Sequence, residues 1–194
     1  IQSMQLRRRE VGDVTWTTLT AYQVPDTDNL NFSFVDYFAR GRNTKYEYSV
    51  NYILKDGTEL PYISASVVSS FCGALITDGK TSYHVFLDPK VTSTTRNRQS
   101  SIVTTLNSRF PYVFYGSKSN YDTGNFSGTI IKNNGVDDWD FDNSYKYRED
   151  MKDWLTNGEA KIIKMEDGRE WLVSVDGNVE EDESEYQFRF CANW

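Results

Sequence analysis

The sequence has little of the residues on which most catalytic and metal sites depend. Its 194 residues include one histidine, His84, and two cysteines, Cys72 and Cys191. The cysteines are far apart and neither has a C-x-x-C partner, which favours buried free thiols over a zinc or redox site. Ser-His-Asp and Cys-His catalysis need a histidine to carry the proton. Because His84 stands inside the apolar pattern at 83–86, we expect a partly buried structural side chain.

Long apolar runs are also missing. No stretch approaches the roughly 18 consecutive apolar residues of a membrane span, and the first residues lack the hydrophobic core of a signal peptide. We therefore expect a soluble protein. The sequence contains no G-x-S-x-G elbow, P-loop, dinucleotide fingerprint or internal repeat. Together these absences predict a protein that is not an enzyme, with no catalytic residue, no cofactor and no resident metal.

Basic charge is scarce as well, since the formal net charge is −7. A nucleic-acid backbone needs a basic face, and the one basic run, Arg7-Arg8-Arg9, would point to both faces of a strand. We therefore expect no nucleic-acid partner. Acidic residues are plentiful, so a pair of carboxylates of the glycosidase type stays possible on composition alone.

Aromatic residues are abundant and predict a mainly β protein. Thirteen Tyr, 11 Phe and 5 Trp make up 15% of the chain, and these types favour strands. Tyr46, Tyr48, Val50 and Tyr52 alternate with polar residues, as in a strand with one face in the core. Turn signals separate the predicted strands of the first part, which are residues 4–11, 14–19, 31–38, 46–54 and 59–63.

The second part predicts further antiparallel strands. Residues 71–76 and 82–87 flank Asp78-Gly79 as a hairpin, and 186–191 is a closing strand. The polar stretch 88–101 predicts a long exposed loop or arm, and the acidic run 180–183 a solvated hairpin tip. The intervening predicted strands are 102–106, 111–115 and 124–131.

Helical periodicity occurs once, over about 144–157. Its apolar stripe consists of Tyr147, Met151, Trp154 and Leu155, while Arg148 is expected on the solvent side. Asn143 or Ser144 can cap the start and Asn157-Gly158 the end. A hairpin of 160–165 and 171–175 around Asp167-Gly168 is predicted to follow.

One acidic string has the spacing of a calcium loop. Asp138, Asp140, Asp142 and Glu149 occupy positions 1, 3, 5 and 12 of an EF-hand pattern. Asn143 stands where the loop needs Gly, and no helix is predicted before the string. The alternative is a strand with Trp139 and Phe141 inward and the aspartates in solvent, running into a capped helix. This alternative is favoured, and calcium binding stays open.

Two segments resemble known families. RRREVGDVTWTTL at 7–19 and YEYSVNYILKDGTEL at 46–60 resemble the middle and end of a fibronectin type III module, which implies an incomplete sandwich over 1–64. TTLNSRFPYVFYGSKSNYDTGNFSGTII at 104–131 and YREDMKDWLTNGEAKIIKMEDGREWLVSV at 147–175 resemble a domain of tail and baseplate proteins of long-tailed bacteriophages. The residues that carry the second resemblance are Thr105, Leu106, Phe110, Pro111, Asn120, Tyr121, Gly124, Gly128, Leu155, Gly158, Lys161, Asp167, Gly168, Arg169 and Trp171.

The second resemblance implies a split β-barrel with a flanking helix, as in distal-tail and tail-tube proteins, and no catalysis. We therefore expect a split β-barrel or sandwich of antiparallel strands with one short helix, in domains 1–64 and 65–194. The expected function is that of a viral structural protein of the virion, in a phage tail or baseplate, that forms homo-oligomeric rings and binds other tail proteins. The alternatives are a β module that binds host glycans and, second, a glycoside-processing enzyme.

Overall fold

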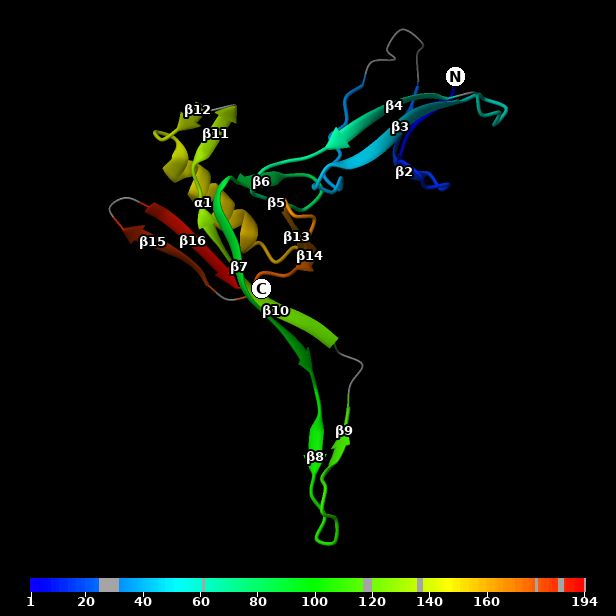
Figure 1. Ribbon diagram of the computed structural model, residues 1–194. Coiled ribbons are helices and arrows are strands. Elements are labelled where there is room, and N and C mark those ends of the chain that lie inside the picture. The colour runs from blue at the N-terminus through cyan, green and yellow to red at the C-terminus, as the bar shows by residue number, and fades with distance from the viewer. Residues whose placement is uncertain are drawn as a thin grey trace. The chain divides into compact units, whose positions relative to one another are not determined.

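The structure is a computed structural model that describes residues 1–24, 32–60, 62–116, 120–135, 138–176, 178–184 and 187–193. Strands hold 53% of the described residues and helix 7%, and the sheets are antiparallel, which confirms a mainly β fold with one short helix in the described part of the chain (Figure 1). The chain forms two compact units. Unit 1 is Ile1–Ser82 with Ile163–Trp171, and unit 2 is Tyr83–Ile162 with Leu172–Trp194.

Unit 1 is built on a four-stranded sheet. Its order is β2-β1-β3-β4, formed by β2 (Thr17–Gln23), β1 (Ser3–Glu10), β3 (Thr44–Ile53) and β4 (Ile63–Ser69). The expected boundary after residue 64 falls within β4. Tyr46 is buried in β3, as the alternation predicts. Ser49 and Asn51, which point to the opposite face, are buried too, and the hydrogen bond that Ser49 Oγ donates to Asn51 Oδ1 at 3.0 Å offsets the cost of burying these polar groups.

Three local predictions in unit 1 are wrong. The part of 31–38 that the structure describes is not a strand; ion pairs and hydrogen bonds to its side chains and carbonyls hold it instead. In 59–63 only Glu59 makes an isolated bridge, with Ile53, before β4 begins. Cys72 is exposed rather than buried. The side chain of Cys191 lies outside the described residues.

The basic run is neutralised within unit 1. Arg7 pairs with Glu59 at 2.8 Å, Arg8 with Asp36 at 2.6 Å and Arg9 with Glu47 at 2.6 Å. Asp36 also accepts a hydrogen bond from Tyr48, whose pKa is raised by burial and by this carboxylate. The side chain of Lys164 is buried and donates to the carbonyls of Tyr37 and of Ala39, the latter at 2.9 Å. These polar contacts connect the segment around Asp36 to the sheet.

Unit 2 contains a second four-stranded sheet, of order β15-β16-β10-β7. Its strands are β15 (Val179–Ser184), β16 (Gln187–Asn193), β10 (Asn120–Thr129) and β7 (Leu87–Arg98). The prediction of a loop over 88–101 is therefore wrong, because pairing with β10 gives this polar segment its backbone hydrogen bonds. The acidic run 180–183 is part of β15 and not a hairpin tip. Phe126 and Ile130 contribute to the buried core.

The remaining strands form one four-stranded sheet and two hairpins. The sheet has the order β14-β13-β5-β6, from β14 (Glu170–Val173), β13 (Lys161–Met165), β5 (Ala74–Thr77) and β6 (Ser82–Val85). The predicted Asp-Gly turn between β13 and β14 is confirmed, with Gly168 at φ +90°. The short pairs are β11 (Lys132–Gly135) with β12 (Asp138–Asp140), and β8 (Ser101–Val103) with β9 (Tyr112–Phe114).

The helix α1 spans Ser144–Leu155 and buries Met151 and Leu155, as its periodicity predicts. Tyr147 and Trp154 are half-buried and lie against Tyr83, with ring centroids 5.1 and 5.0 Å away. Asn143 is the N-terminal cap position but makes no side-chain capping bond. The helix ends before Thr156, whose backbone N–H donates to the Lys152 carbonyl at 3.1 Å.

Two side chains at the helix depart from the predicted pattern. Ser144 is buried; its hydroxyl donates to the Asp140 carbonyl at 2.6 Å and accepts from the Lys132 backbone N–H at 3.0 Å. Arg148 was expected in solvent but is 5% exposed. Its Nε donates to Glu181 in β15 at 2.7 Å, so a carboxylate distant in sequence makes burial of the charge tolerable.

Candidate functional site

The structure places the four residues of the acidic string on different elements. Asp138 and Asp140 lie in β12, Asp142 lies in the turn that follows, and Glu149 lies in α1. Among the described residues there is no group of three or more His, Cys, Asp or Glu side chains that could hold a metal ion. The string therefore follows the alternative of a strand that runs into a helix. Two details of that alternative are wrong, because Phe141 is exposed rather than inward and the side chain of Asp140 is only 14% exposed.

The oxygens of Asp140 are occupied by protein donors. Lys132 Nζ donates to Oδ2 at 2.9 Å, and the backbone N–H of Asn143 donates to Oδ1 at 3.1 Å. The Lys132 hydrogen bond, followed by those from Asn143, lowers the pKa of Asp140 to about 2. Glu149 forms an ion pair with Lys152, one turn along the helix. Both carboxylates thus have structural partners.

His84 lies in β6 and is half-buried, as its sequence context predicts. Its ring stacks on Phe86 with centroids 3.6 Å apart, and Phe86 meets the edge of Trp139 at 5.7 Å. A ring in an aromatic stack of this kind contributes to packing.

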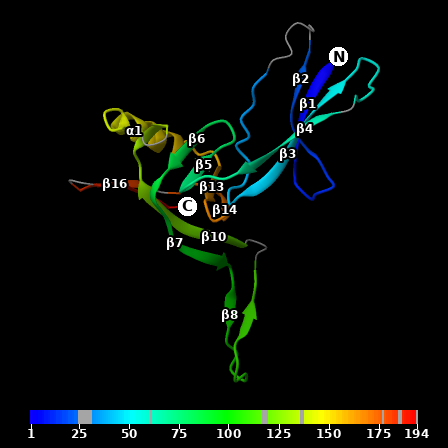
Figure 2. The ribbon, with the colours of Figure 1, turned by 45° about the horizontal axis from the view of Figure 1, so that its top comes forward.

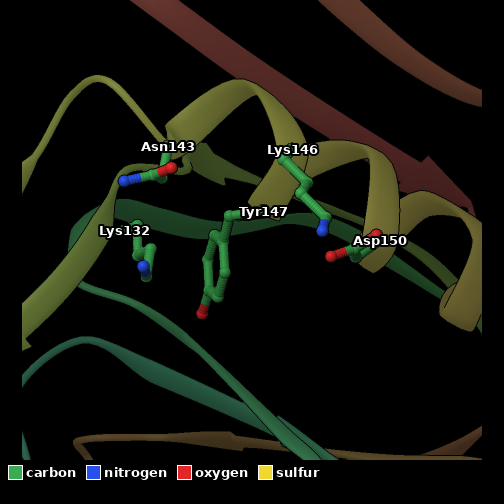
Figure 3. A pocket seen from close by; sticks show the side chains of 5 residues that line it. All are labelled: Lys132, Asn143, Lys146, Tyr147 and Asp150. Atoms are coloured by element: carbon green, nitrogen blue, oxygen red, sulfur yellow. The ribbon is translucent and has the colours of Figure 1, made fainter.

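A cavity of ≈ 280 Å³ lies beside the start of α1 (Figure 3). Its lining consists of Lys132, Asn143, Lys146, Tyr147 and Asp150. Burial raises the pKa of Tyr147, and a hydrogen bond with the His84 backbone opposes that shift. Among the described residues of this lining, Asp150 is the one carboxylate.

The most unusual surface of unit 2 is the hairpin of β8 and β9, residues 101–116, which we call the arm. Every residue of both strands is exposed, and Figures 1 and 2 show the arm beyond the ends of β7 and β10, away from α1. Leu106 at the tip is fully exposed and Phe110 is 72% exposed. The other exposed apolar residues of the arm are Ile102, Val103, Tyr112, Val113, Phe114 and Tyr115.

The register of the arm explains why its apolar side chains remain exposed. Ile102 pairs with Val113, and Val103 pairs with Tyr112, so neighbouring pairs point to opposite faces. Both faces are therefore apolar. A two-stranded hairpin has no second layer to cover either face and is marginally stable alone. Contiguous exposed apolar surface of this kind marks an interaction site.

The arm and the strands that lead to it are basic, unlike the rest of the chain. From the start of β7 to the end of β10, residues 87–129 contain five Lys and Arg and two Asp, a formal charge of +3, so the remaining residues carry −10. One of the two aspartates, Asp122, pairs with Arg96 at 2.9 Å. Arg98 stacks on Tyr115 at 3.9 Å, which places a cation next to an aromatic ring at the base of the arm. Arg109 is exposed at the tip, next to Phe110.

The sequence of β9 predicts a strand but does not reveal that the strand is exposed. Residues 112–115 are four consecutive apolar residues, a pattern typical of a strand that is buried on both faces. In the described structure nothing covers either face.

Comparison of the chain with protein-family models, curated proteins and solved structures finds no match in any of the three. Among the described residues, no helix has the length and hydropathy to cross a membrane.

Proposed function

We propose that this chain is a non-enzymatic structural protein that assembles with copies of itself through the arm. The observation that carries the proposal is the two-faced apolar hairpin at 101–116, all of whose strand residues are exposed. In a protein that acts as a monomer, such an exposed apolar surface would have no use and would favour aggregation. In an assembly, the same surface can bind a neighbouring subunit.

The size of the arm suits a specific interface. Full burial of one large apolar side chain contributes about 1.5–3 kcal/mol. Eight partly exposed side chains can thus supply on the order of 10 kcal/mol or more, which is comparable with the roughly 4–15 kcal/mol that association costs. Arm contacts alone give moderate affinity, and repeated contacts in a closed assembly strengthen it.

The resemblance of 104–131 and 147–175 to tail and baseplate domains supplies a setting for this proposal. Phage tails and baseplates are rings and stacks of repeated subunits, and a subunit of that kind needs surfaces that meet its neighbours. We therefore extend the proposal to a component of a phage tail or baseplate, located in the virion. The glycan-binding alternative stays a prediction, since aromatic rings of the arm could also stack on sugars.

Sedimentation velocity over a concentration series tests the assembly role. We expect the wild-type chain to form oligomers and Leu106→Ser/Phe110→Ser to be monomeric. The control is Val14→Ser/Ile63→Ser, which removes two exposed apolar side chains of unit 1 and should assemble like wild type. A wild-type chain that stays monomeric throughout, or an arm variant that assembles as well as wild type, would contradict the proposal.

A further inference from the structure

We infer that the arm of one copy binds the surface at the start of α1 on a second copy; this inference rests on the assembly role proposed above. We call the receiving surface the acceptor corner. It consists of the exposed residues Asp138, Phe141, Asp142 and Tyr145, with the partly exposed Glu149 beside them.

The acceptor corner offers apolar surface that its own unit does not cover. Phe141 is 66% exposed and Tyr145 is 64% exposed. They lie on either side of Ser144, where the helix begins. Exposed aromatic side chains are common anchors at protein interfaces, because they bury a large area and lose little rotamer freedom. The apolar residues of the arm need a surface of this type.

The charge of the acceptor corner is opposite to that of the arm. Residues 138–153 contain six Asp and Glu and three Lys and Arg, a formal charge of −3. Two of those three cations, Arg148 and Lys152, bind Glu181, and Lys152 also pairs with Glu149 of the corner. Asp138 and Asp142 are exposed beside Phe141. A basic apolar arm is thus complementary to an acidic aromatic corner, and complementary charge of this kind sets orientation and association rate.

The geometry of unit 2 favours a second copy over the same copy. The arm extends past the ends of β7 and β10 on the side away from α1, as both views show (Figures 1 and 2). Arm and corner are different surfaces, so their contact is heterologous: each copy gives one arm and receives another. Such contacts produce a ring when the rotation closes and a filament when it does not.

Mixing two inactive variants provides the test. The arm variant is Leu106→Ser/Phe110→Ser, and the corner variant is Phe141→Ser/Tyr145→Ser. The control is Leu172→Ser, which removes another exposed apolar side chain of unit 2. Each double variant alone should associate at least tenfold more weakly than wild type, while the control should not change. The equimolar mixture should form heterodimers and stop there, because one intact arm and one intact corner remain. Native mass spectrometry of mass-tagged variants distinguishes these species.

Charge and salt complete the test. Asp142→Lys should weaken association without an effect on folding, and raising the salt concentration should weaken wild-type association, because exposed charges are screened. A corner variant that assembles as well as wild type, beside an arm variant that does not, would refute the acceptor corner and leave the assembly role standing. Two variants that stay monomeric when mixed would also refute it. A monomeric wild-type chain would instead refute the assembly role itself.

Discussion

Glu181→Gln should destabilise unit 2, because Glu181 is the counter-ion of a buried cation. The Glu181 side chain is 13% exposed and accepts from Arg148 Nε and Lys152 Nζ, both at 2.7 Å. The Arg148 side chain is 6% exposed. An amide at position 181 keeps the shape of the carboxylate but removes its charge, so a buried guanidinium loses its counter-ion. The amide oxygen can still accept a hydrogen bond, but the charge that offsets desolvation of the cation is gone.

The expected magnitude follows from the burial of this group. Removing one partner of a buried ion pair costs about 3–5 kcal/mol, and the retained amide oxygen reduces this to about 3 kcal/mol. With a urea m-value of about 1–3 kcal/mol/M, the unfolding midpoint should fall by roughly 1–3 M. Urea is the right denaturant, because guanidinium would screen the ion pair under study. Trp fluorescence, to which Trp154 in α1 contributes, reports the transition.

The pH dependence supplies an independent check. Burial alone would raise the pKa of Glu181, but the hydrogen bond and charge of Lys152 and the charge of Arg148 outweigh it, and the pKa is lowered. A lowered pKa in the folded state contributes stability that is complete above the unfolded value of about 4.3. That contribution disappears as the pH falls through the folded pKa. The difference between wild type and Glu181→Gln should therefore be largest near pH 7 and shrink below about pH 4.

Glu180→Gln is the matched control, since Glu180 is the exposed neighbour in the same strand. It makes the same chemical change and should alter the free energy of unfolding by no more than about 0.5 kcal/mol. Equal effects of the two substitutions at pH 7 would refute the argument that Glu181 neutralises a buried cation. A difference between them that persists unchanged at pH 3 would refute the assignment to its ionised carboxylate.

Two further predictions concern unit 2. Gly128→Ala should lower the free energy of unfolding in urea by about 1–3 kcal/mol, because a Cβ there would lie 2.5 Å from Cγ1 of Val85, a stiff β-branched side chain. The control is Gly116→Ala, which should be nearly neutral because a Cβ at Gly116 would have no heavy atom within 4 Å. In an NMR titration the Asp140 carboxyl should titrate near pH 2 and shift towards 3.8 in Lys132→Met, since the Lys132 hydrogen bond is the largest cause of its low pKa. A titration unchanged by that substitution would show that Lys132 does not control it.

Local patterns were sufficient to predict the elements whose partners are close in sequence. The stripe of α1 places Met151 and Leu155 in the core, and the Asp167-Gly168 turn joins β13 to β14, because both depend on spacing within a few residues. The abundance of aromatic and β-branched residues likewise indicated a mainly β chain. In β7 the repeated Thr residues favour a strand, whereas the polar composition of the segment predicts a loop.

Tertiary structure decided which side chains are covered, and this determined the candidate site. Arg148 is buried because Glu181, in a strand far along the chain, reaches it. The four apolar residues at 112–115 are exposed because, in the part of the chain that the structure describes, β9 pairs with β8 alone and no second layer lies on either face. The sequence shows how apolar a strand is, but the elements packed against the strand determine how much of its apolar surface is exposed to water. In this protein, the lack of such packing in the described structure makes β9 part of an exposed arm instead of a core strand.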